Sequence, residues 1–218
     1  MDAMIIVENA VFNYPNSASS DAPVISGFSA CFDRSEITAV TGKNGCGKTT
    51  LTKLLVGLLR PLSGSVSIDD TDTAGLDLFE IGQRVGYVFQ NPSRQLFCDT
   101  VYNEVAFGLR NQGLNEAQTE EKAVSFLELF GLSRYSDTYP GKLSLGEKRR
   151  LALAAVLALG TDYLVLDEPT AGLDALSQRE LGEMLSMLRH ERRCGIVVVS
   201  HEAGFIARYA DRELVMAR

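Results

Sequence analysis

A glycine-rich segment, GKNGCGKTT at residues 42–50, carries a lysine and two hydroxyl side chains at fixed spacing. It fits the pattern G-x-x-x-x-G-K-[ST], follows a short β-rich run and opens a run with leucines at helical spacing. Glycines let such a loop curl its backbone N–H groups around phosphate oxygens. Lys48 can then face the β- and γ-phosphates of a nucleotide, Thr49 can bind Mg²⁺, and Thr50 can reach the α-phosphate. This context favours a phosphate site over an accidental glycine-rich turn.

Two acidic residues end the run YLVLDE at residues 163–168. The apolar residues before them indicate a strand buried on both faces of a mainly parallel sheet. Asp167 and Glu168 therefore lie at a carboxyl strand end, where open α/β sheets bind ligands. Asp167 can hold a Mg²⁺ shell, and Glu168 can polarise a water molecule as a general base. Alone, the pair could equally be two solvated acids, and the glycine-rich loop favours the catalytic interpretation.

A third candidate is the segment KLSLGEKRR at residues 142–150. Ser144 and Glu147 stand three apart before a long apolar run, which is the pattern of a capping box at a helix N-terminus. A helix N-terminus carries unpaired N–H groups and a partial positive charge, so it attracts anions. The pattern predicts a helix start that either caps itself or receives an anion.

These residues require alternating strands and helices to bring them together. Strand patterns occur at 36–42, 63–69, 84–90, 163–168, 195–201 and 213–217, and helix patterns at 48–59, 175–193 and 205–211. This order predicts an α/β sheet with crossover helices. From 91 to 160 the pattern is helical with little strand signal, so we expect an all-helical lobe inserted into the α/β core.

Composition limits the possible classes of protein. The chain has 218 residues and a formal net charge of −7, so it is a poor default binder of nucleic acid or anionic lipid. Its four cysteines are too far apart in sequence to suggest a zinc site or redox pair, and we expect reduced, mostly buried thiols. The N-terminus lacks the pattern of a signal peptide, and no run approaches the ~18 apolar residues of a membrane span. We therefore expect a soluble protein that could sit on a membrane partner.

In this order the motifs resemble those of ABC-transporter ATPase subunits, and the resemblance covers nearly the whole chain. Segments 42–49, 143–147, 164–168 and 171–174 resemble the family's Walker A loop, LSGGQ signature, Walker B strand and D-loop. Tyr14, Gln90 and His201 stand where the family has its adenine-stacking aromatic, Q-loop glutamine and switch histidine. Each of these three is weak alone, and His201 alone would more readily be an ordinary strand-end histidine.

The resemblance implies an α/β P-loop NTPase fold with a mainly parallel core sheet, an N-terminal antiparallel β subdomain and an inserted all-helical lobe. It implies one domain at 1–218, with a nucleotide-binding core at 1–90 and 161–218 and a lobe at 91–160. It implies hydrolysis of ATP with Mg²⁺. The implied catalytic residues are Lys48, Gln90, Glu168 and His201. The implied nucleotide contacts are Tyr14, Gly42, Asn44, Gly45, Cys46, Gly47, Lys48, Thr49, Thr50, Ser144, Gly146 and Asp174, and the implied Mg²⁺ ligands are Thr49, Gln90 and Asp167.

The stretch QNPSRQLFCDTVYNEVAFGL at 90–109 is similar to that of energy-coupling factor (ECF) and cobalt/nickel importer ATPases. In that group two ATPase chains, identical or different, pair beneath a transmembrane coupling protein, and a separate membrane subunit captures a vitamin or metal ion. The resemblance thus implies a peripheral protein at the cytoplasmic face of the membrane, without a nucleic-acid partner. The alternatives are that the stretch only packs the lobe, and that the chain serves another importer class, a soluble ABC ATPase or a nucleotide-gated scaffold.

The signature segment departs from the family pattern. Leu145 replaces its first glycine and Glu147 replaces its glutamine, whereas Ser144 and Gly146 remain. The resemblance implies that Ser144 and Gly146 face the Walker A loop of a second ATPase chain, so the anion at this helix start would come from the partner. ECF ATPases usually continue into a C-terminal pairing segment, so we interpret the chain as a short member, half of a tandem protein or a trimmed piece.

Overall fold

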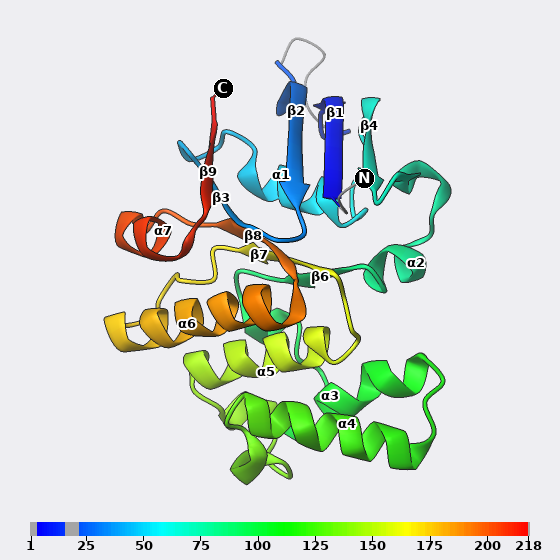
Figure 1. The fold of residues 1–218 in the computed structure, drawn as a ribbon, viewed down its shortest axis with the longest axis vertical. Coiled ribbons are helices and arrows are strands. Elements are labelled where there is room, and N and C mark those ends of the chain that lie inside the picture. The colour runs from blue at the N-terminus through cyan, green and yellow to red at the C-terminus, as the bar shows by residue number, and fades with distance from the viewer. Residues whose placement is uncertain (1–3, 16–21, 218) are drawn as a thin grey trace.

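The computed structural model describes residues 4–15 and 22–217 (Figure 1). One sheet is antiparallel, with strand order β2-β1-β4-β5 and bounds β1 Met4–Phe12, β2 Ile25–Asp33, β4 Ser63–Ile68 and β5 Thr71–Asp72. The other is parallel, with order β6-β7-β8-β3-β9 and bounds β3 Ile37–Gly42, β6 Val85–Val88, β7 Tyr163–Asp167, β8 Gly195–Val199 and β9 Arg212–Met216. The signal-peptide prediction rests partly on residues outside the described ranges and stays a prediction.

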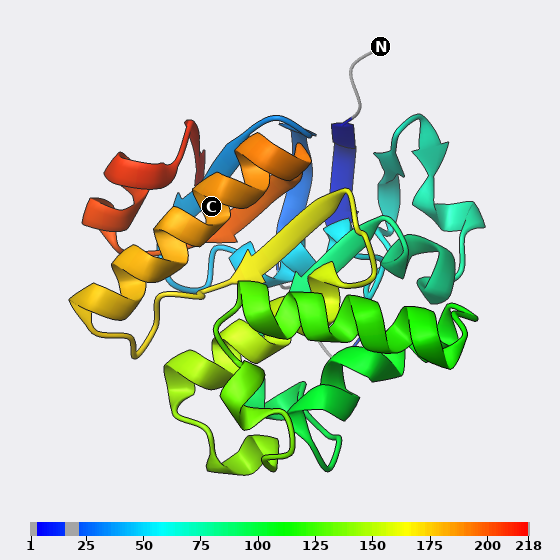
Figure 2. The same cartoon turned by 60° about the horizontal axis from the view of Figure 1, so that its bottom comes forward.

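Seven α-helices connect or cover these strands in the described ranges. Their bounds are α1 Lys48–Leu55, α2 Leu78–Gly82, α3 Val101–Asn111, α4 Glu116–Leu129, α5 Leu145–Leu157, α6 Ala175–Arg192 and α7 Ala203–Tyr209. Between β6 and β7 the chain forms α3, α4 and α5 and no strand, all within described residues. In Figures 1 and 2, α5 lies between the parallel sheet and the pair α3 and α4. The predicted α/β fold with antiparallel and helical parts is confirmed, whereas the domain boundaries at 90 and 160 stay a prediction.

The parallel sheet separates two hydrophobic cores because neighbouring strand residues point to opposite faces. On β7, Leu164 and Leu166 join the core formed with α3, α4, α5 and α6. Tyr163 and Val165 join the core formed with α1 and the antiparallel sheet. All five residues of β7 are buried, which explains its continuous apolar sequence and fixes the strand end that carries the acids.

Several elements end earlier than their patterns predict, and two of these differences bear on the site. The helical pattern at 48–59 yields a helix that stops at Leu55, because Gly57 takes a left-handed conformation with φ of +70°. The strand pattern at 84–90 ends at Val88. Gln90 therefore leaves the sheet, and its side chain is free to turn toward the acids at the end of β7.

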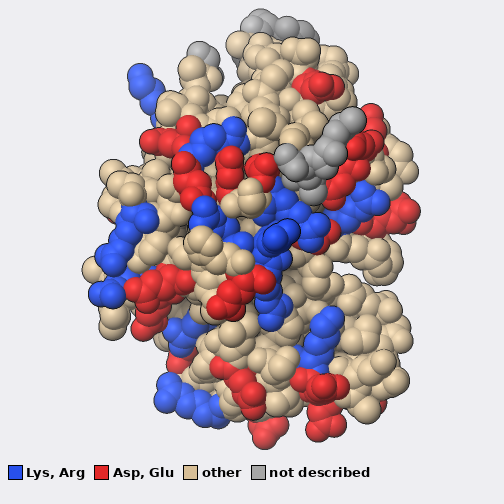
Figure 3. Space-filling view, in the orientation of Figure 1, with Lys and Arg blue, Asp and Glu red and all other residues tan. Residues whose placement is uncertain are grey.

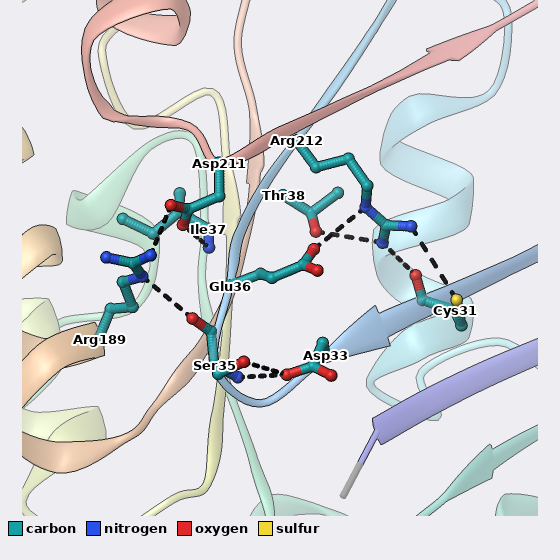
Figure 4. A network of polar contacts seen from close by, with 9 residues as sticks. All are labelled: Cys31, Asp33, Ser35, Glu36, Ile37, Thr38, Arg189, Asp211 and Arg212. Carbon is teal, nitrogen blue, oxygen red and sulfur yellow. Dashed lines mark hydrogen bonds and ion pairs between the residues drawn. The ribbon is translucent and has the colours of Figure 1, made fainter. Parts of the chain in front are cut away.

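Arg212 ties β9 to the antiparallel sheet and to β3 (Figure 4). Its guanidinium lies 3.2 Å from a carboxylate oxygen of Glu36 and donates to Thr38 Oγ1 at 3.3 Å. It also donates to the carbonyl oxygen of Cys31 on β2. These contacts fasten the start of β3, whose other end leads into the glycine-rich loop.

Arg189 of α6 reinforces the same end of the sheet (Figure 4). It pairs with Asp211 at 2.6 Å and donates to the carbonyl oxygen of Ser35 at 3.0 Å. Asp211 in turn accepts a hydrogen bond from the backbone N–H of Ile37 at 2.8 Å. Because one carboxylate joins a helix and a strand start, this network positions β3 and α6 relative to each other.

Acidic and basic side chains are interspersed over the face of the molecule seen in Figure 3. On α6, Arg179 pairs with Glu183 at 2.7 Å, and Arg150 of α5 reaches Glu180 of α6 at 3.4 Å. Exposed pairs of this kind each contribute about 0–1 kcal/mol, so apolar packing rather than charge holds α5 against α6.

Candidate active site

The glycine-rich loop joins the end of β3 to the start of α1, and two of its glycines are sterically required. Gly42 and Gly47 have φ values of +144° and +101°, a range that other residues rarely adopt. A Cβ atom on Gly42 would lie 2.6 Å from the Met216 carbonyl oxygen, and one on Gly47 would lie 2.8 Å from Ile25 Cδ1. Gly47 is also the N-cap of α1 and supplies no side-chain cap. The first N–H groups of α1 can therefore serve an anion.

Lys48, the first residue of α1, folds its side chain back over this loop. Its Nζ donates to the carbonyl oxygens of Gly42 at 2.9 Å and Lys43 at 3.1 Å, and the residue is 6% exposed. Carbonyl groups thus hold the ammonium in place without neutralising it. A nearly buried cation above a curled loop fits the phosphate chain of a nucleotide.

Thr49 and Asp167 bring two oxygen ligands together at the edge of the parallel sheet. Thr49 Oγ1 donates to Asp167 Oδ1 at 3.2 Å, and the Tyr87 hydroxyl donates to Asp167 Oδ2 at 3.4 Å. Burial raises the pKa of Asp167, and burial also raises the pKa of Tyr87 to about 12. A carboxylate and a hydroxyl beside a phosphate loop are the ligands that Mg²⁺ prefers, so these residues fit that ion.

Glu168 lies directly after β7 and is held from both sides. Its Oε2 accepts from Gln90 Nε2 at 3.0 Å, and its Oε1 lies 3.2 Å from His201 Nε2. The backbone of Glu168 has a φ of +47°, a conformation that costs a non-glycine residue about 1–3 kcal/mol and is concentrated at active sites. Three of the four implied catalytic residues, Gln90, Glu168 and His201, therefore converge from the segments that follow three strands.

Tyr14 contacts the start of α1 from the segment that follows β1. Its hydroxyl lies 3.3 Å from Thr50 Oγ1, and its ring stands edge-on to Phe12 with centroids 5.1 Å apart. The side chain is 40% exposed, so a ring face beside the phosphate loop is open to an aromatic base.

Cys46 and Asn44 occupy the same loop with opposite exposure. Cys46 is 4% exposed and packs in the core beneath the loop, so only its backbone can contact a nucleotide. Asn44 is exposed at the loop surface. Cys46 and Cys194 are buried, whereas Cys98 is partly exposed and Cys31 is exposed, so the expectation of mostly buried thiols holds for only two of the four cysteines.

A cavity of about 750 Å³ opens beside the acids, between the sheet edge and the start of α5. Its lining includes the expected Thr49, Gln90 and Asp167, and also Lys53, Tyr87, Phe89, Asn91, Arg94, Leu145, Arg149, Ala171 and Gly172. Sequence patterns did not single out Tyr87 or Arg149. Tyr87 belongs to the strand pattern at 84–90 and Arg149 to the start of the predicted helix after Ser144, and neither pattern marks its residue as functional.

The predicted capping box at the start of α5 is present. Ser144 Oγ accepts from the Glu147 N–H at 3.3 Å, and the Ser144 N–H and hydroxyl donate to Glu147 Oε2 at 2.9 and 2.8 Å. A hydrogen bond from Tyr135, together with those from Ser144, holds the pKa of Glu147 at about 2. Within the described chain, the helix start therefore caps itself with the Ser144 hydroxyl and the Glu147 carboxylate.

Two further residues implied as nucleotide contacts, Gly146 and Asp174, also make no hydrogen bond with the phosphate loop within the described residues. Asp174 is the N-cap of α6 and accepts from the Ser177 N–H at 2.7 Å. Gly146 lies on α5, where a Cβ atom would meet Ser177 Oγ at 3.8 Å. No hydrogen bond among the described residues joins Ser144, Gly146 or Asp174 to the loop at 42–50. One chain thus gathers the loop and the strand-end residues, and within the described residues it does not hydrogen-bond Ser144, Gly146 or Asp174 to that loop.

The Glu147 cap predicts a pH dependence of stability. Its folded pKa of about 2 lies below the roughly 4.3 of an unfolded glutamate, so its stabilising contribution is complete above the unfolded value and is lost as pH falls toward 2. We expect the difference in free energy of unfolding between the wild type and Glu147→Ala to be constant from about pH 7 to 5 and to shrink below about pH 4. Urea titrations at several pH values test this, and a difference that grows on acidification would contradict it.

A glycine-rich loop that opens a helix beside a strand-end acid pair is the arrangement of P-loop nucleotide hydrolases. The family model described as ABC transporter matches residues 25–171 of the chain. The chain therefore belongs to the ABC transporter ATP-binding family, whose members are ATP-hydrolysing cassettes, and it is an ATPase that binds ATP.

Individual relatives agree with this assignment. A Pyrococcus furiosus protein named for ATP binding in an ABC transporter is 44% identical over 195 residues, which is 89% of this chain and 74% of the relative. A similarly named Vibrio vulnificus protein is 36% identical over 99% of this chain, which spans only 37% of that longer relative.

Solved structures show the same fold. CbiO1 from Clostridium perfringens, described as part of the ABC transporter complex CbiONQ, superimposes with a TM-score of 0.89 at 32% identity. The match covers 99% of this chain and 85% of CbiO1. A bacterial ABC transporter cassette solved as a dimer matches with a TM-score of 0.86 at 25% identity, over 97% of this chain and 94% of that one. The described helices include none that is long and apolar enough to cross a membrane.

Proposed function

We propose that this chain is the ATP-hydrolysing subunit of an ECF-type membrane importer and powers the uptake of a vitamin or a transition-metal ion. The observation that supports this most is its likeness to CbiO1, part of a CbiONQ transporter complex, over 99% of the chain. The stretch at 90–109, which resembles this group in sequence, contributes Gln90 to the active site and then forms α3. The transported molecule is captured by a different subunit in this proposal.

The site geometry supports a division of labour among its residues. Lys48 and the loop N–H groups bind the phosphates, and Tyr14 stacks on the base. Thr49, Asp167 and Gln90 would hold Mg²⁺, which supplies charge neutralisation on the phosphate oxygens. Glu168 orients the attacking water and accepts its proton, because it is the carboxylate held between an amide and an imidazole.

His201 completes this set at the γ-phosphate end. His201 lies in the loop that follows β8, and its Nε2 lies 3.2 Å from Glu168 Oε1, so the imidazole is next to the proposed base. We propose that it contacts the γ-phosphate and steadies the charge of the transition state. In this scheme the catalytic gain comes from positioned groups rather than from a covalent intermediate.

We further propose that a complete site needs two chains. The loop at 42–50 makes no hydrogen bond with Ser144, Gly146 or Asp174 of its own chain within the described residues. These three residues are therefore available to the loop of a second ATPase chain, identical or different. Two-fold pairing would then form two equivalent composite sites. The γ-phosphate from the partner would have to displace the Glu147 carboxylate from Ser144, which makes this signature a switchable cap.

An exposed aromatic pair supports a membrane partner. Phe97 and Phe107 are 67% and 45% exposed, and their ring centroids lie 5.0 Å apart. Glu104 Oε2 accepts from the N–H groups of Phe97 and Cys98 at 2.9 and 2.8 Å, which fixes the loop that presents the pair. We propose that this surface docks on the transmembrane coupling protein and places the chain peripherally at the cytoplasmic face of the membrane.

Co-purification with membrane subunits tests this proposal. We expect Phe97→Asp to abolish capture of the coupling protein, because a charge on a contact aromatic is costly, while ATP affinity stays within about twofold. Val215→Asp, which changes an equally exposed apolar residue on β9, is the matched control and should retain the complex. The molecule bound to the purified complex would then identify the substrate. Undiminished capture by Phe97→Asp would contradict the docking surface.

A further inference from the structure

Arg149 is the largest fully buried side chain in the described part of the protein, with 2% of its surface exposed. It lies on α5 and lines the 750 Å³ cavity that also contains Gln90 and Asp167. No carboxylate among the described residues lies within ion-pair distance of its guanidinium, and its Nε has no hydrogen-bond partner there. A buried charge without a counterion is expensive for folding, so stability alone does not explain this residue.

The contacts of Arg149 close a ring around the general base. Its Nη2 donates to the carbonyl oxygen of Gln90 at 3.0 Å, and its Nη1 reaches the carbonyl oxygen of Ala171 at 3.4 Å. Gln90 donates its side-chain amide to Glu168 Oε2 at 3.0 Å, and the Ala171 N–H donates to the Glu168 carbonyl oxygen at 3.2 Å. Both residues that Arg149 holds are thus hydrogen-bonded to Glu168, one to its carboxylate and one to its backbone.

The hydrogen bonds from Gln90 and Ala171 surround Glu168, whose backbone conformation is unfavourable by itself. Glu168 has a φ of +47°, and such a conformation persists only where the surroundings over-determine it. A guanidinium suits that task because its planar fork can donate to two carbonyl groups in fixed directions, which a lysine ammonium does not. Burial lowers the pKa of Arg149 to about 10, so the side chain still carries its charge near neutral pH.

We propose that Arg149 is a positioning residue for ATP hydrolysis: it fixes Gln90 and Ala171 on either side of Glu168 and so holds the base in its reactive orientation. Arg149 lies on α5, the helix that Ser144 caps, so the same helix would carry both the partner-facing cap and the support of its own base. The inference rests on the role proposed for Glu168.

The test uses the purified full chain and separates kcat from KM for ATP. Arg149→Met should lower kcat roughly 10- to 100-fold, as expected for a misplaced catalytic group, with KM changed less than about twofold. Its thermal midpoint should be unchanged or higher, because an apolar side chain replaces an unpaired buried charge. Arg149→Lys should be intermediate in kcat. Arg84→Met, which removes an arginine that donates to Ile68 and Thr71 away from the site, is the matched control and should keep kcat.

A double-mutant cycle decides whether Arg149 acts through Gln90. In a Gln90→Ala background, Arg149→Met should cost clearly less than in the wild type, because the group it positions is already absent. Full additivity, or a kcat within twofold of wild type for Arg149→Met or Arg149→Lys, would overturn the inference. If Arg149→Met does not fold, the lysine variant carries the same cycle. Should Glu168→Gln retain hydrolysis, the role proposed for Glu168 fails; should only the Arg149 variants retain it, this inference alone fails.

Discussion

Glu168→Gln is expected to lower ATP turnover about 10²- to 10⁴-fold, the range lost when a general base is removed, while ATP binding stays intact. Glutamine preserves the shape of the side chain and can keep its contacts with Gln90 and His201, which lie at 3.0 and 3.2 Å in the wild type. It cannot accept the proton of the attacking water. The nucleotide contacts proposed for Lys48 and Tyr14 are untouched by this change.

Phosphate release and nucleotide titration on the same protein sample separate the two effects. Glu183→Gln, which neutralises an exposed acid on α6 that pairs with Arg179, is the matched control and should leave both quantities unchanged. Hydrolysis at the wild-type rate in Glu168→Gln would remove Glu168 from the role of base. A loss of binding in Glu168→Gln would instead assign the carboxylate to the nucleotide contacts.

Lys48→Ala is expected to weaken ATP binding roughly 10- to 100-fold, because charge-assisted hydrogen bonds contribute about 1.5–3 kcal/mol. The ammonium is nearly buried and is held by two loop carbonyl groups, so no neighbouring side chain replaces it after truncation. Isothermal titration calorimetry with ATP measures the change.

Lys43→Ala is the matched control for this prediction. Lys43 lies in the same loop, but its side chain is exposed and only its backbone carbonyl contacts Lys48. We expect its affinity for ATP to stay within about twofold of wild type. Equal losses in both variants would mean that general positive charge, rather than the placed Lys48 ammonium, binds the phosphates.

Much of the site could be predicted from the sequence because its residues follow strands. The pattern at 36–50 placed a glycine loop between a strand and a helix, and the apolar run at 163–167 placed Asp167 and Glu168 at a sheet edge. In a parallel sheet such ends lie side by side, so separate motifs in the sequence converge in space. The family resemblance added Tyr14, Gln90 and His201, which are individually weak signals.

What the sequence did not reveal depends on contacts between distant segments. Arg149 belongs to a charged KRR run whose local sequence does not indicate burial, and the packing of α5 against the loops after β6 and β7 buries it. The early end of β6 was also not predicted. The strand stops at Val88, and Gln90 therefore lies in the following loop, which no local sequence pattern indicates. The capping box at Ser144 was local and was therefore correctly predicted, whereas its proposed exchange with a partner phosphate is not a property of one chain.

The central claim is that two chains share each ATP site, and a mixing experiment measures it directly. Ser144→Arg and Lys48→Ala chains, each in a Glu168→Gln background, are examined separately and as an equimolar mixture by sedimentation velocity with ATP and Mg²⁺. Each variant alone has one damaged half in every composite site, whereas the mixed pair has one intact site. We expect dimers in the mixture and monomers in each variant alone. Monomers in the mixture, together with no ATP-driven pairing of the Glu168→Gln chain itself, would contradict the shared site.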